Sequence, residues 1–207
     1  MIRTALLTVS DRGAGGPAED RTVQAIREVL AGGSFVEVDY QVVPGEQARI
    51  RAKLRVLTEN ADVDLVLTVG GVGLAPRDRL PEAMAEVAER QVPGLVAAMQ
   101  AAATRIDPLA ALARLAVAVR RDTLVVNLPE TADAARAALA TIAGVLPTAC
   151  EDLLRRSLLV DASGDVPGDA PGDAAGAPGR SGAEDPTGAA SEADAPSLGR
   201  PTRRTGR

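Results

Sequence analysis

The stretch Val63-Asp-Leu-Val-Leu-Thr-Val-Gly-Gly-Val-Gly-Leu-Ala-Pro-Arg-Asp78 decides how this chain folds. Its apolar run, 65–69, has the length and composition of a buried strand. The strand ends in a turn that contains Gly70, Gly71 and Gly73, and a helical pattern follows. Such a strand-to-helix turn exposes backbone N–H groups at the carboxyl edge of a sheet, where open α/β folds bind anionic ligands. The stretch therefore indicates an α/β fold with a candidate anion site.

This turn matches neither of the two common phosphate-binding motifs. It lacks the Gly-Lys-Ser/Thr of a P-loop, and its Gly-Gly-x-Gly spacing is not the dinucleotide fingerprint. Arg77 and Asp78 follow the glycines and add a cation for an anionic ligand and a carboxylate for a metal or a proton. An ordinary turn, with Asp78 as the N-cap of the next helix, would explain the same spacing. Both alternatives remain open at this point.

The rest of the chain alternates between strand and helix patterns. The expected strands are 2–9, 35–43, 63–69 and 123–127, and the expected helices are 19–30, 47–57, 81–89, 94–105, 108–115 and 133–154, the last broken once by Gly144 and Pro147. Alternation of this kind predicts the α/β class, as a three-layer α/β/α arrangement with a mainly parallel sheet.

The composition excludes several kinds of chemistry. The chain has no histidine, which rules out Ser-His-Asp and Cys-His catalysis and histidine-bound metals. Its one cysteine, Cys150, lies in an apolar helical stretch and is expected to be a buried, inert thiol. The formal net charge of −5 gives no general affinity for nucleic acid or anionic membranes. Without a signal-peptide pattern or a long apolar run, we expect a cytoplasmic protein that does not span a membrane.

The composition changes after about Val160. Gly, Pro, Ala, Asp and Arg dominate the remainder, which cannot bury enough apolar area to offset the entropy of ordering. We therefore expect one folded domain over residues 1–156 and a disordered tail over 157–207.

Five segments, in the same order along the chain, resemble the MoaB/Mog family of molybdenum-cofactor biosynthesis proteins. Residues 68–82 are similar to the family's Thr-x-Gly-Gly-Thr-Gly-x-x-x-Arg-Asp-x-Thr-Pro-Glu segment. The other four are the Thr-Val-Ser-Asp-Arg of 8–12, the Pro-Gly-x-x-x-x-Met of 93–99, the Leu-Ala-Arg of 112–114 and the Asn-Leu-Pro of 127–129. The resemblance covers about residues 1–156.

The resemblance implies a function, a set of ligands and a set of site residues. Members of this family transfer adenylate from ATP to the terminal phosphate of molybdopterin with a divalent cation. It thus implies a nucleotidyltransferase with ATP, Mg²⁺ and molybdopterin as ligands, a homotrimer as the assembly, and Asp78 as the catalytic carboxylate and metal ligand. The substrate-binding residues that it implies are Ser10, Asp11, Gly70, Gly71, Val72, Gly73, Arg77, Asn127, Leu128 and Pro129.

The chain also departs from the family pattern at five positions. Gly45 stands in the place of an aspartate and is expected to be free to adopt a positive φ, and Glu130 replaces a glycine near the ligand. The other three are Val72 for threonine, Leu80 for threonine and Ala113 for serine. Three hypotheses therefore compete: a molybdopterin adenylyltransferase, a non-catalytic pterin- or nucleotide-binding paralogue, and a structural or partner-binding oligomer.

Overall fold

The computed structural model describes the backbone of residues 1–11 and 17–163, and the side chains of 1–11 and 21–155. The described residues all belong to one compact unit. The expected disordered tail lies outside the described residues from 164 onward. Its first seven residues, 157–163, continue a helix, so the boundary expected at 156 stays a prediction.

The elements follow the expected alternation. They are β1 (Ile2–Val9), α1 (Pro17–Ala31), β2 (Phe35–Val43), α2 (Gln47–Glu59), β3 (Leu65–Val69), α3 (Leu80–Val87), β4 (Arg90–Gln91), α4 (Pro93–Ile106), the 3₁₀ helix η1 (Pro108–Leu112), β5 (Val117–Arg120), β6 (Thr123–Leu128), α5 (Ala132–Ile142) and α6 (Leu146–Ser163). The first two strands have the expected bounds, and most helix ends differ from expectation by a few residues.

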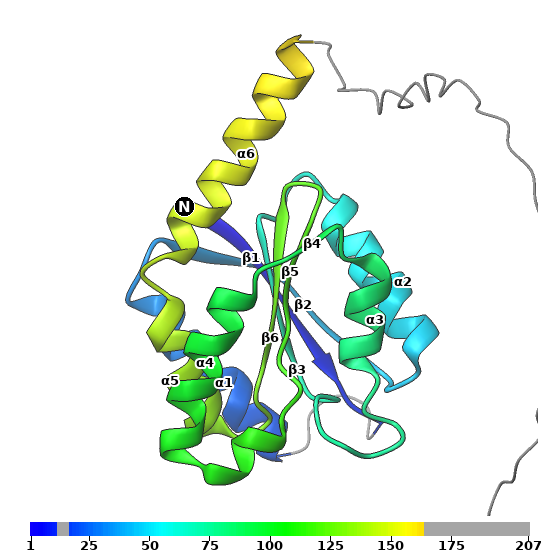
Figure 1. Cartoon of the computed structure of the whole chain (residues 1–207), viewed down its shortest axis with the longest axis vertical. Coiled ribbons are helices and arrows are strands. Elements are labelled where there is room, and N and C mark those ends of the chain that lie inside the picture. The colour runs from blue at the N-terminus through cyan, green and yellow to red at the C-terminus, as the bar shows by residue number, and fades with distance from the viewer. Residues whose placement is uncertain (12–16, 164–207) are drawn as a thin grey trace, which may run out of the picture. The chain divides into compact units, whose positions relative to one another are not determined.

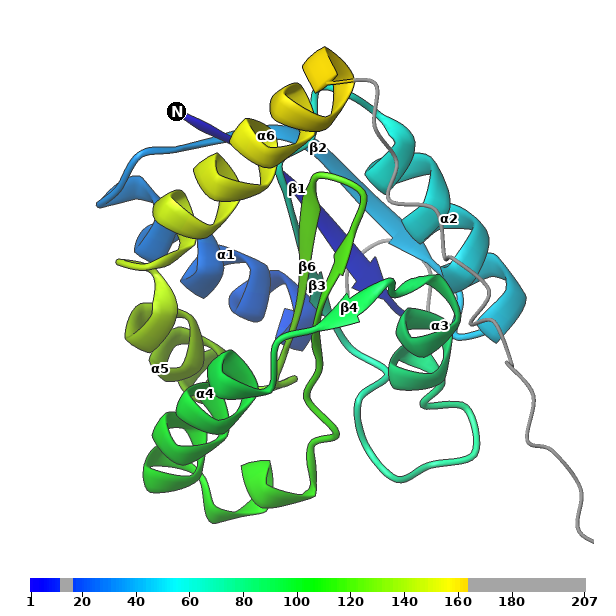
Figure 2. The same ribbon diagram turned by 45° about the horizontal axis from the view of Figure 1, so that its top comes forward.

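The six strands of the described residues form one sheet in the order β2-β1-β3-β6-β5-β4. Strands β2, β1, β3 and β6 run parallel, and β5 is antiparallel to both of its neighbours. Helices α1, α4 and α5 cover one face of the sheet, whereas α2 and α3 cover the other (Figures 1 and 2). The expected three-layer architecture with a mainly parallel sheet is confirmed.

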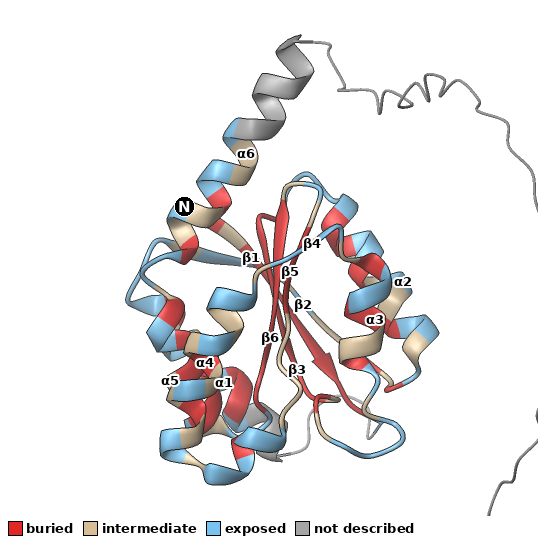
Figure 3. Ribbon diagram, in the orientation of Figure 1, coloured by how far each residue is buried: buried red, intermediate tan, exposed pale blue. Residues whose placement is uncertain are grey.

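The core is divided by the sheet into two apolar layers, because successive side chains of a strand point to opposite faces. On β1, Leu6 packs with the helices α1, α4 and α5, while Ala5 and Leu7 pack with α2 and α3. The central strands are therefore buried along their length, and many of the exposed residues lie on the helices (Figure 3). Alanine, valine and leucine make most of both layers, as the composition predicts.

The sequence patterns missed strands β4 and β5. The helix expected over 108–115 is a 3₁₀ helix that stops at Leu112, after which the chain turns extended at Ala113. Strand β5 pairs with β6 through a two-residue turn in which Arg121 has a φ of 51°. Glycine and asparagine are the residues that usually indicate a hairpin turn. An Arg-Asp turn does not, so the sequence pattern did not predict this hairpin.

The single cysteine behaves as expected. Cys150 lies in the second turn of α6 and is fully buried, and burial raises the pKa of its thiol to about 12. A thiol with so high a pKa carries almost no thiolate at neutral pH, so it is inert as a nucleophile.

None of the helices in the described part of the chain is by itself long and apolar enough to cross a membrane. The segments Ala132–Ile142 and Leu146–Arg155 meet the length and composition test only as a pair bent by 57°.

A buried ion pair holds the amino ends of β1 and β3 together. Asp64 is 3% exposed and accepts hydrogen bonds from the backbone N–H of Arg3 at 2.8 Å and from its Nη2 at 2.6 Å. Burial disfavours the charged carboxylate, but the bonds from Arg3 outweigh it and keep the pKa of Asp64 below its usual range.

We expect Asp64→Asn to lower the free energy of unfolding by about 2 kcal/mol at pH 7, because it leaves the Arg3 guanidinium with only the exposed Asp62 carboxylate as an anionic partner. The pKa of Asp64 is lower in the folded chain than in the unfolded one. Its contribution is therefore complete at neutral pH and is lost as the pH falls below about 4. Urea titrations of both proteins between pH 7 and pH 3 would show the gap closing, and a gap that stays constant would contradict this assignment.

Candidate functional site

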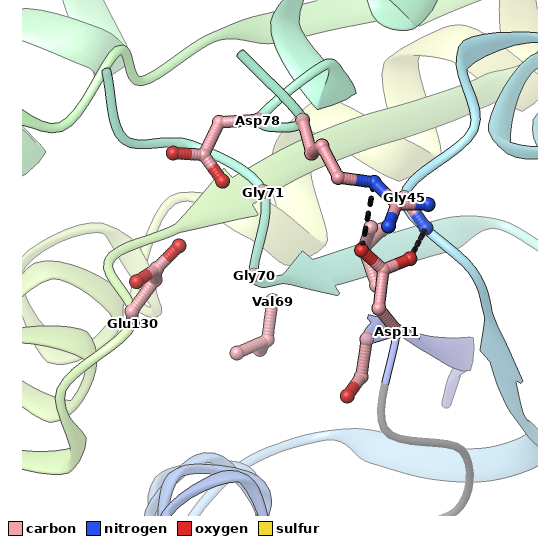
Figure 4. Close-up of a pocket in the computed structure, with 10 residues that line it drawn as sticks. Asp11, Gly45, Val69, Gly70, Gly71, Asp78 and Glu130 are labelled. Carbon is pink, nitrogen blue, oxygen red and sulfur yellow. Dashed lines mark hydrogen bonds and ion pairs between the residues drawn. The ribbon is translucent and has the colours of Figure 1, made fainter. Parts of the chain in front are cut away.

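A cavity of about 280 Å³ opens at the carboxyl edge of the parallel strands. The register places Val69 of β3 beside Thr8 of β1 and beside Leu128 of β6, so the strands end in one row. The chain segments that leave these ends meet around one hollow (Figure 4). Its lining residues are Val9, Ser10, Asp11, Gly45, Val69, Gly70, Gly71, Arg77, Asp78 and Glu130.

Two glycines with left-handed backbones form one wall of this cavity. Gly70 has a φ of 87° and Gly71 a φ of 67°. A Cβ atom on Gly70 would lie 2.3 Å from the carbonyl oxygen of Val9, so the turn after β3 passes directly against the end of β1. Only glycine satisfies both the conformation and the close approach. This turn lies at the carboxyl edge of the sheet, where the sequence places it.

Asp11 joins three segments on one side of the cavity. Its Oδ1 accepts a hydrogen bond from the backbone N–H of Gly45 at 2.9 Å, and its Oδ2 lies 3.1 Å from Nε of Arg77. Gly45 is not among the glycines with positive φ, so the expectation of a left-handed backbone there is wrong. The hydrogen bond to Asp11 holds this turn, and a Cβ at Gly45 would lie 3.1 Å from the carbonyl oxygen of Arg77.

Asp78 closes its own loop instead of capping a helix. Its Oδ2 accepts a hydrogen bond from the backbone N–H of Ala75 at 2.8 Å. The N-cap of α3 is Arg79, and no side chain caps that helix end, so the N-cap alternative for Asp78 is wrong. A Cβ on Gly73 would lie 2.7 Å from Asp78 Oδ2, which explains the third glycine of the turn.

Two carboxylates face each other on the side of the cavity opposite Asp11. Asp78 and Glu130 point toward the same part of the hollow, and Asp11 lies on the other side (Figure 4). Arg77 pairs with Asp11. Side chains of residues 1–11 and 21–155 supply no group of three or more His, Cys, Asp or Glu that could hold a metal ion by themselves. One or two carboxylates that share a cation with ligand phosphates is the usual arrangement for Mg²⁺. The donor set here fits that arrangement.

A second pocket of about 210 Å³ adjoins the first and shares Glu130 with it. It lies between η1 and the turns that follow β3 and β6, where Leu109 and Leu112 are 71% and 54% exposed. Its lining residues are Val72, Gly73, Asp107, Leu109, Ala110, Leu112, Ala113, Pro129, Glu130 and Thr131. The second pocket is the more apolar of the two.

The structure divides the predicted site residues into three groups. Those around the first cavity are Ser10, Asp11, Gly70, Gly71, Arg77 and Asp78. Those around the second are Val72, Gly73 and Pro129.

The third group, Asn127 and Leu128, lines neither pocket, and both side chains are fully buried. Asn127 Oδ1 accepts a hydrogen bond from the backbone N–H of Ala116 at 2.6 Å, and its Nδ2 donates to the carbonyl oxygen of Arg114 at 3.4 Å. Leu128 packs in the core layer of α1, α4 and α5. Their side chains therefore support the fold around the site.

Sequence reasoning missed four residues of the first cavity and one residue behind it. Val9, Val69, Gly45 and Glu130 line the cavity, and the last two had been singled out only as departures from a family pattern. Arg114 lies behind the loop that carries Asp78 and binds that loop. Its only sequence signal is the third position of the Leu-Ala-Arg segment.

Comparisons with known proteins agree with this geometry. Residues 5–148 match the family described as "Probable molybdopterin binding domain". The molybdopterin adenylyltransferase of Helicobacter pylori J99 is 33% identical over 155 residues, which cover 74% of this chain and 88% of that protein. The molybdopterin adenylyltransferase of Escherichia coli K12 is 35% identical over 130 residues, 62% of this chain and 67% of that protein.

A solved structure shows the same fold. The molybdopterin biosynthesis enzyme MoaB of Thermus thermophilus superposes with a TM-score of 0.68 at 46% identity, over 74% of this chain and 96% of that one. The residues that match the family model include both pockets and every predicted site residue. The chain therefore belongs to the MoaB/Mog family of probable molybdopterin-binding domains.

Proposed function

We propose that this protein acts in molybdenum cofactor biosynthesis as a molybdopterin adenylyltransferase, which joins adenylate from ATP to molybdopterin. The observation that carries the proposal is the cavity at the sheet's carboxyl edge, where a glycine turn, a guanidinium and a carboxylate meet. Relatives that are 33% and 35% identical carry this activity in their names. Two adjoining pockets also suit a reaction that brings two substrates together.

The residues of the cavity suit an in-line displacement at phosphorus. Gly70 and Gly71 bring backbone to the cavity wall, where we assign their N–H groups as fixed donors to phosphate oxygens that need no reorganisation as charge develops. Arg77 is 68% exposed on its side chain and is held by Asp11, so it can exchange that partner for a phosphate. Asp78 is the residue we assign to hold Mg²⁺. The cation, when bound, neutralises charge on the transferring group.

The family resemblance suggests the assembly and the span of the folded domain, and the sequence patterns suggest the compartment and the tail. We infer a homotrimer in the cytoplasm, with residues 1–156 as the molybdopterin-binding domain and 157–207 as an addition to it. Light scattering of the purified protein would give the subunit number.

The experiment that tests the function is a direct product assay. Purified protein is incubated with ATP, MgCl₂ and molybdopterin, and mass spectrometry detects adenylylated molybdopterin and pyrophosphate. A reaction with EDTA and one with AMP in place of ATP serve as controls. Binding of molybdopterin without product would favour the non-catalytic paralogue, and absence of both binding and product would contradict the proposal.

Glu130→Gln is expected to tighten ATP binding about 5-fold when EDTA removes divalent cations. The Glu130 carboxylate lines the cavity, where it repels the phosphates, and glutamine keeps its shape without the charge. Saturating Mg²⁺ should shrink this difference, because the cation neutralises the same phosphates. Equilibrium titration with a fluorescent ATP analogue, with and without Mg²⁺, measures the affinity of the variant and of the wild-type protein under both conditions. Equal affinities of the two proteins in EDTA would show that Glu130 does not face the phosphates.

A further inference from the structure

We propose that Arg114 is a positioning residue, which holds the loop between β3 and α3 so that Asp78 and Arg77 face the cavity. Arg114 itself lines neither the first cavity nor the second pocket. It lies behind the loop, on the segment that links η1 to β5. The inference rests on the proposed adenylyl transfer for its kinetic part, and on the structure alone for the loop.

The guanidinium of Arg114 binds both ends of the loop and the helix that follows. Its Nε donates to the carbonyl oxygen of Gly73 at 2.8 Å, where the loop leaves the glycine turn. Its Nη2 donates to the carbonyl oxygen of Asp78, where the loop ends. Its Nη1 pairs with Oε1 of Glu82 in the first turn of α3. All three nitrogens are therefore engaged, and each contact is to a different part of the loop and helix.

The loop needs such a clamp because little of it is buried. The four residues 74–77 are all exposed, so side-chain packing contributes little to fixing the loop. Within the loop, Asp78 accepts from the backbone N–H of Ala75, which shapes the loop but does not attach it to the rest of the domain. On the other side, Arg77 reaches Asp11 through an ion pair whose guanidinium is mostly exposed. The half-buried guanidinium of Arg114 is the firmer attachment.

The backbone of Arg114 is itself fixed from the core. Its N–H donates to the carbonyl oxygen of Val72 at 2.8 Å, and its carbonyl oxygen accepts from Nδ2 of Asn127 at 3.4 Å. Asn127 is fully buried at the end of β6. Hydrogen bonds therefore connect the sheet to the loop, from Asn127 to Arg114 and from Arg114 to the loop. This role accounts for a buried asparagine in the segment predicted to bind substrate.

The pairing with Glu82 makes the clamp specific for arginine. The Arg114 hydrogen bond lowers the pKa of Glu82 from its usual value, so the carboxylate stays charged and holds one arm of the guanidinium in place. With Nη1 held by Glu82, the planar guanidinium directs its remaining N–H groups at the carbonyl oxygens of Gly73 and Asp78. A lysine ammonium could pair with Glu82 but cannot span both carbonyl oxygens, because it is a single point charge on a flexible stem.

The test compares Arg114→Lys with Arg120→Lys. Arg120 is a matched control, because its side chain is also poorly exposed and also bridges a carbonyl oxygen, that of Val87, and a glutamate, Glu59. It lies at the hairpin between β5 and β6, at the end of the sheet opposite the cavity. Both variants should lose a similar amount of thermal stability, so stability alone cannot separate them.

Two readouts separate a positioning role from a structural one. Hydrogen exchange of a peptide that covers 72–79 should speed up at least 5-fold in Arg114→Lys and stay unchanged in Arg120→Lys, because only the first variant releases the loop. The kcat of adenylyl transfer should fall about 10-fold in Arg114→Lys. The Mg²⁺ concentration for half-maximal rate should rise as well, while Arg120→Lys keeps wild-type values.

A third variant, Glu82→Gln, tests whether the loop is held by the ion pair with Glu82 or by the two hydrogen bonds from the guanidinium to backbone carbonyl oxygens. Glu82→Gln retains an acceptor for Nη1 and leaves both carbonyl contacts, so its loop exchange and kcat should stay within about 3-fold of wild type. Exchange at 72–79 that is equal in Arg114→Lys and wild type would overturn the proposal. So would equal kinetic losses in Arg114→Lys and Arg120→Lys. If the wild-type protein makes no product, the proposed function fails, and the exchange measurement alone decides the role of Arg114.

Discussion

The Asp78→Asn variant is expected to transfer adenylate at least 100-fold more slowly than the wild-type protein, about 3 kcal/mol in the barrier. Asparagine has almost the same shape, and its carbonyl oxygen can still accept the hydrogen bond from the backbone N–H of Ala75. The loop should therefore keep its form. What the variant loses is the negative charge that faces the cavity beside Glu130, which is the charge we assign to hold the cation.

Steady-state kinetics and thermal unfolding, measured on the same preparation, test this prediction. The thermal midpoint should change by no more than about 2 °C, because one partly exposed charge contributes little to stability. Asp62→Asn is a suitable control, since it also removes one carboxylate, at the amino end of β3 and away from the cavity. Unchanged turnover of Asp78→Asn at saturating Mg²⁺ would leave Asp78 with the loop hydrogen bond as its only role.

Gly70→Ala is expected to lower the free energy of unfolding by about 4 kcal/mol, a large share of the stability of a typical domain. Two effects add. A φ of 87° is strained for alanine, and its Cβ would lie 2.3 Å from the carbonyl oxygen of Val9. Because that neighbour is backbone in the middle of a parallel sheet, relief requires that the ends of β1 and β3 separate. The cavity wall would move with them, so adenylyl transfer should be lost as well.

Two other glycines provide controls for this substitution. Gly71→Ala meets Cγ1 of Val9 at 3.2 Å with a φ of 67°, so it should cost less, about 2 kcal/mol, because a side chain can shift where backbone cannot. At Gly94 in α4 a Cβ meets nothing within 4 Å, and alanine there should be neutral or stabilising by up to about 1 kcal/mol. Urea unfolding of the three variants should give this order of stabilities. A Gly70→Ala protein as stable as Gly94→Ala would show that the turn at Gly70 has room for a Cβ atom.

Much of the fold was predictable because its signals are local. The strand 2–9 and the strand 35–43 have the bounds that their apolar patterns predict, and the glycine turn after β3 lies where the sequence places it. The strand 117–120 escaped prediction, because its turn carries Arg121 and Asp122 in place of the glycine or asparagine that usually announces a hairpin. The residues just before it, 113–115, were predicted as helix, since short apolar runs carry too few turns to distinguish the two periods.

In the candidate site, too, local sequence signals predicted the position of some residues and not of others. Predicted residues next to a strand end, such as Ser10, Asp11 and Asp78, lie around the cavity, because parallel strands carry their carboxyl ends to one edge. Asn127 follows the same rule along the chain, yet its side chain turns into the core and binds the backbone of Ala116. The direction of a side chain at a strand end depends on the neighbouring segment, which a pattern along one strand does not contain.

The sequence by itself determined the class of fold, the four parallel strands, the glycine turn and the family, because periodicity, turn chemistry and ordered motifs are properties of short segments. The tertiary structure alone decided that Asp11, Gly45 and Arg77 form one cluster, that Asp78 braces its own loop, and that Arg114 reaches back 41 residues to Gly73. Most of these contacts join residues far apart in the chain. They exist only after the strands align and bring their ends within hydrogen-bonding distance.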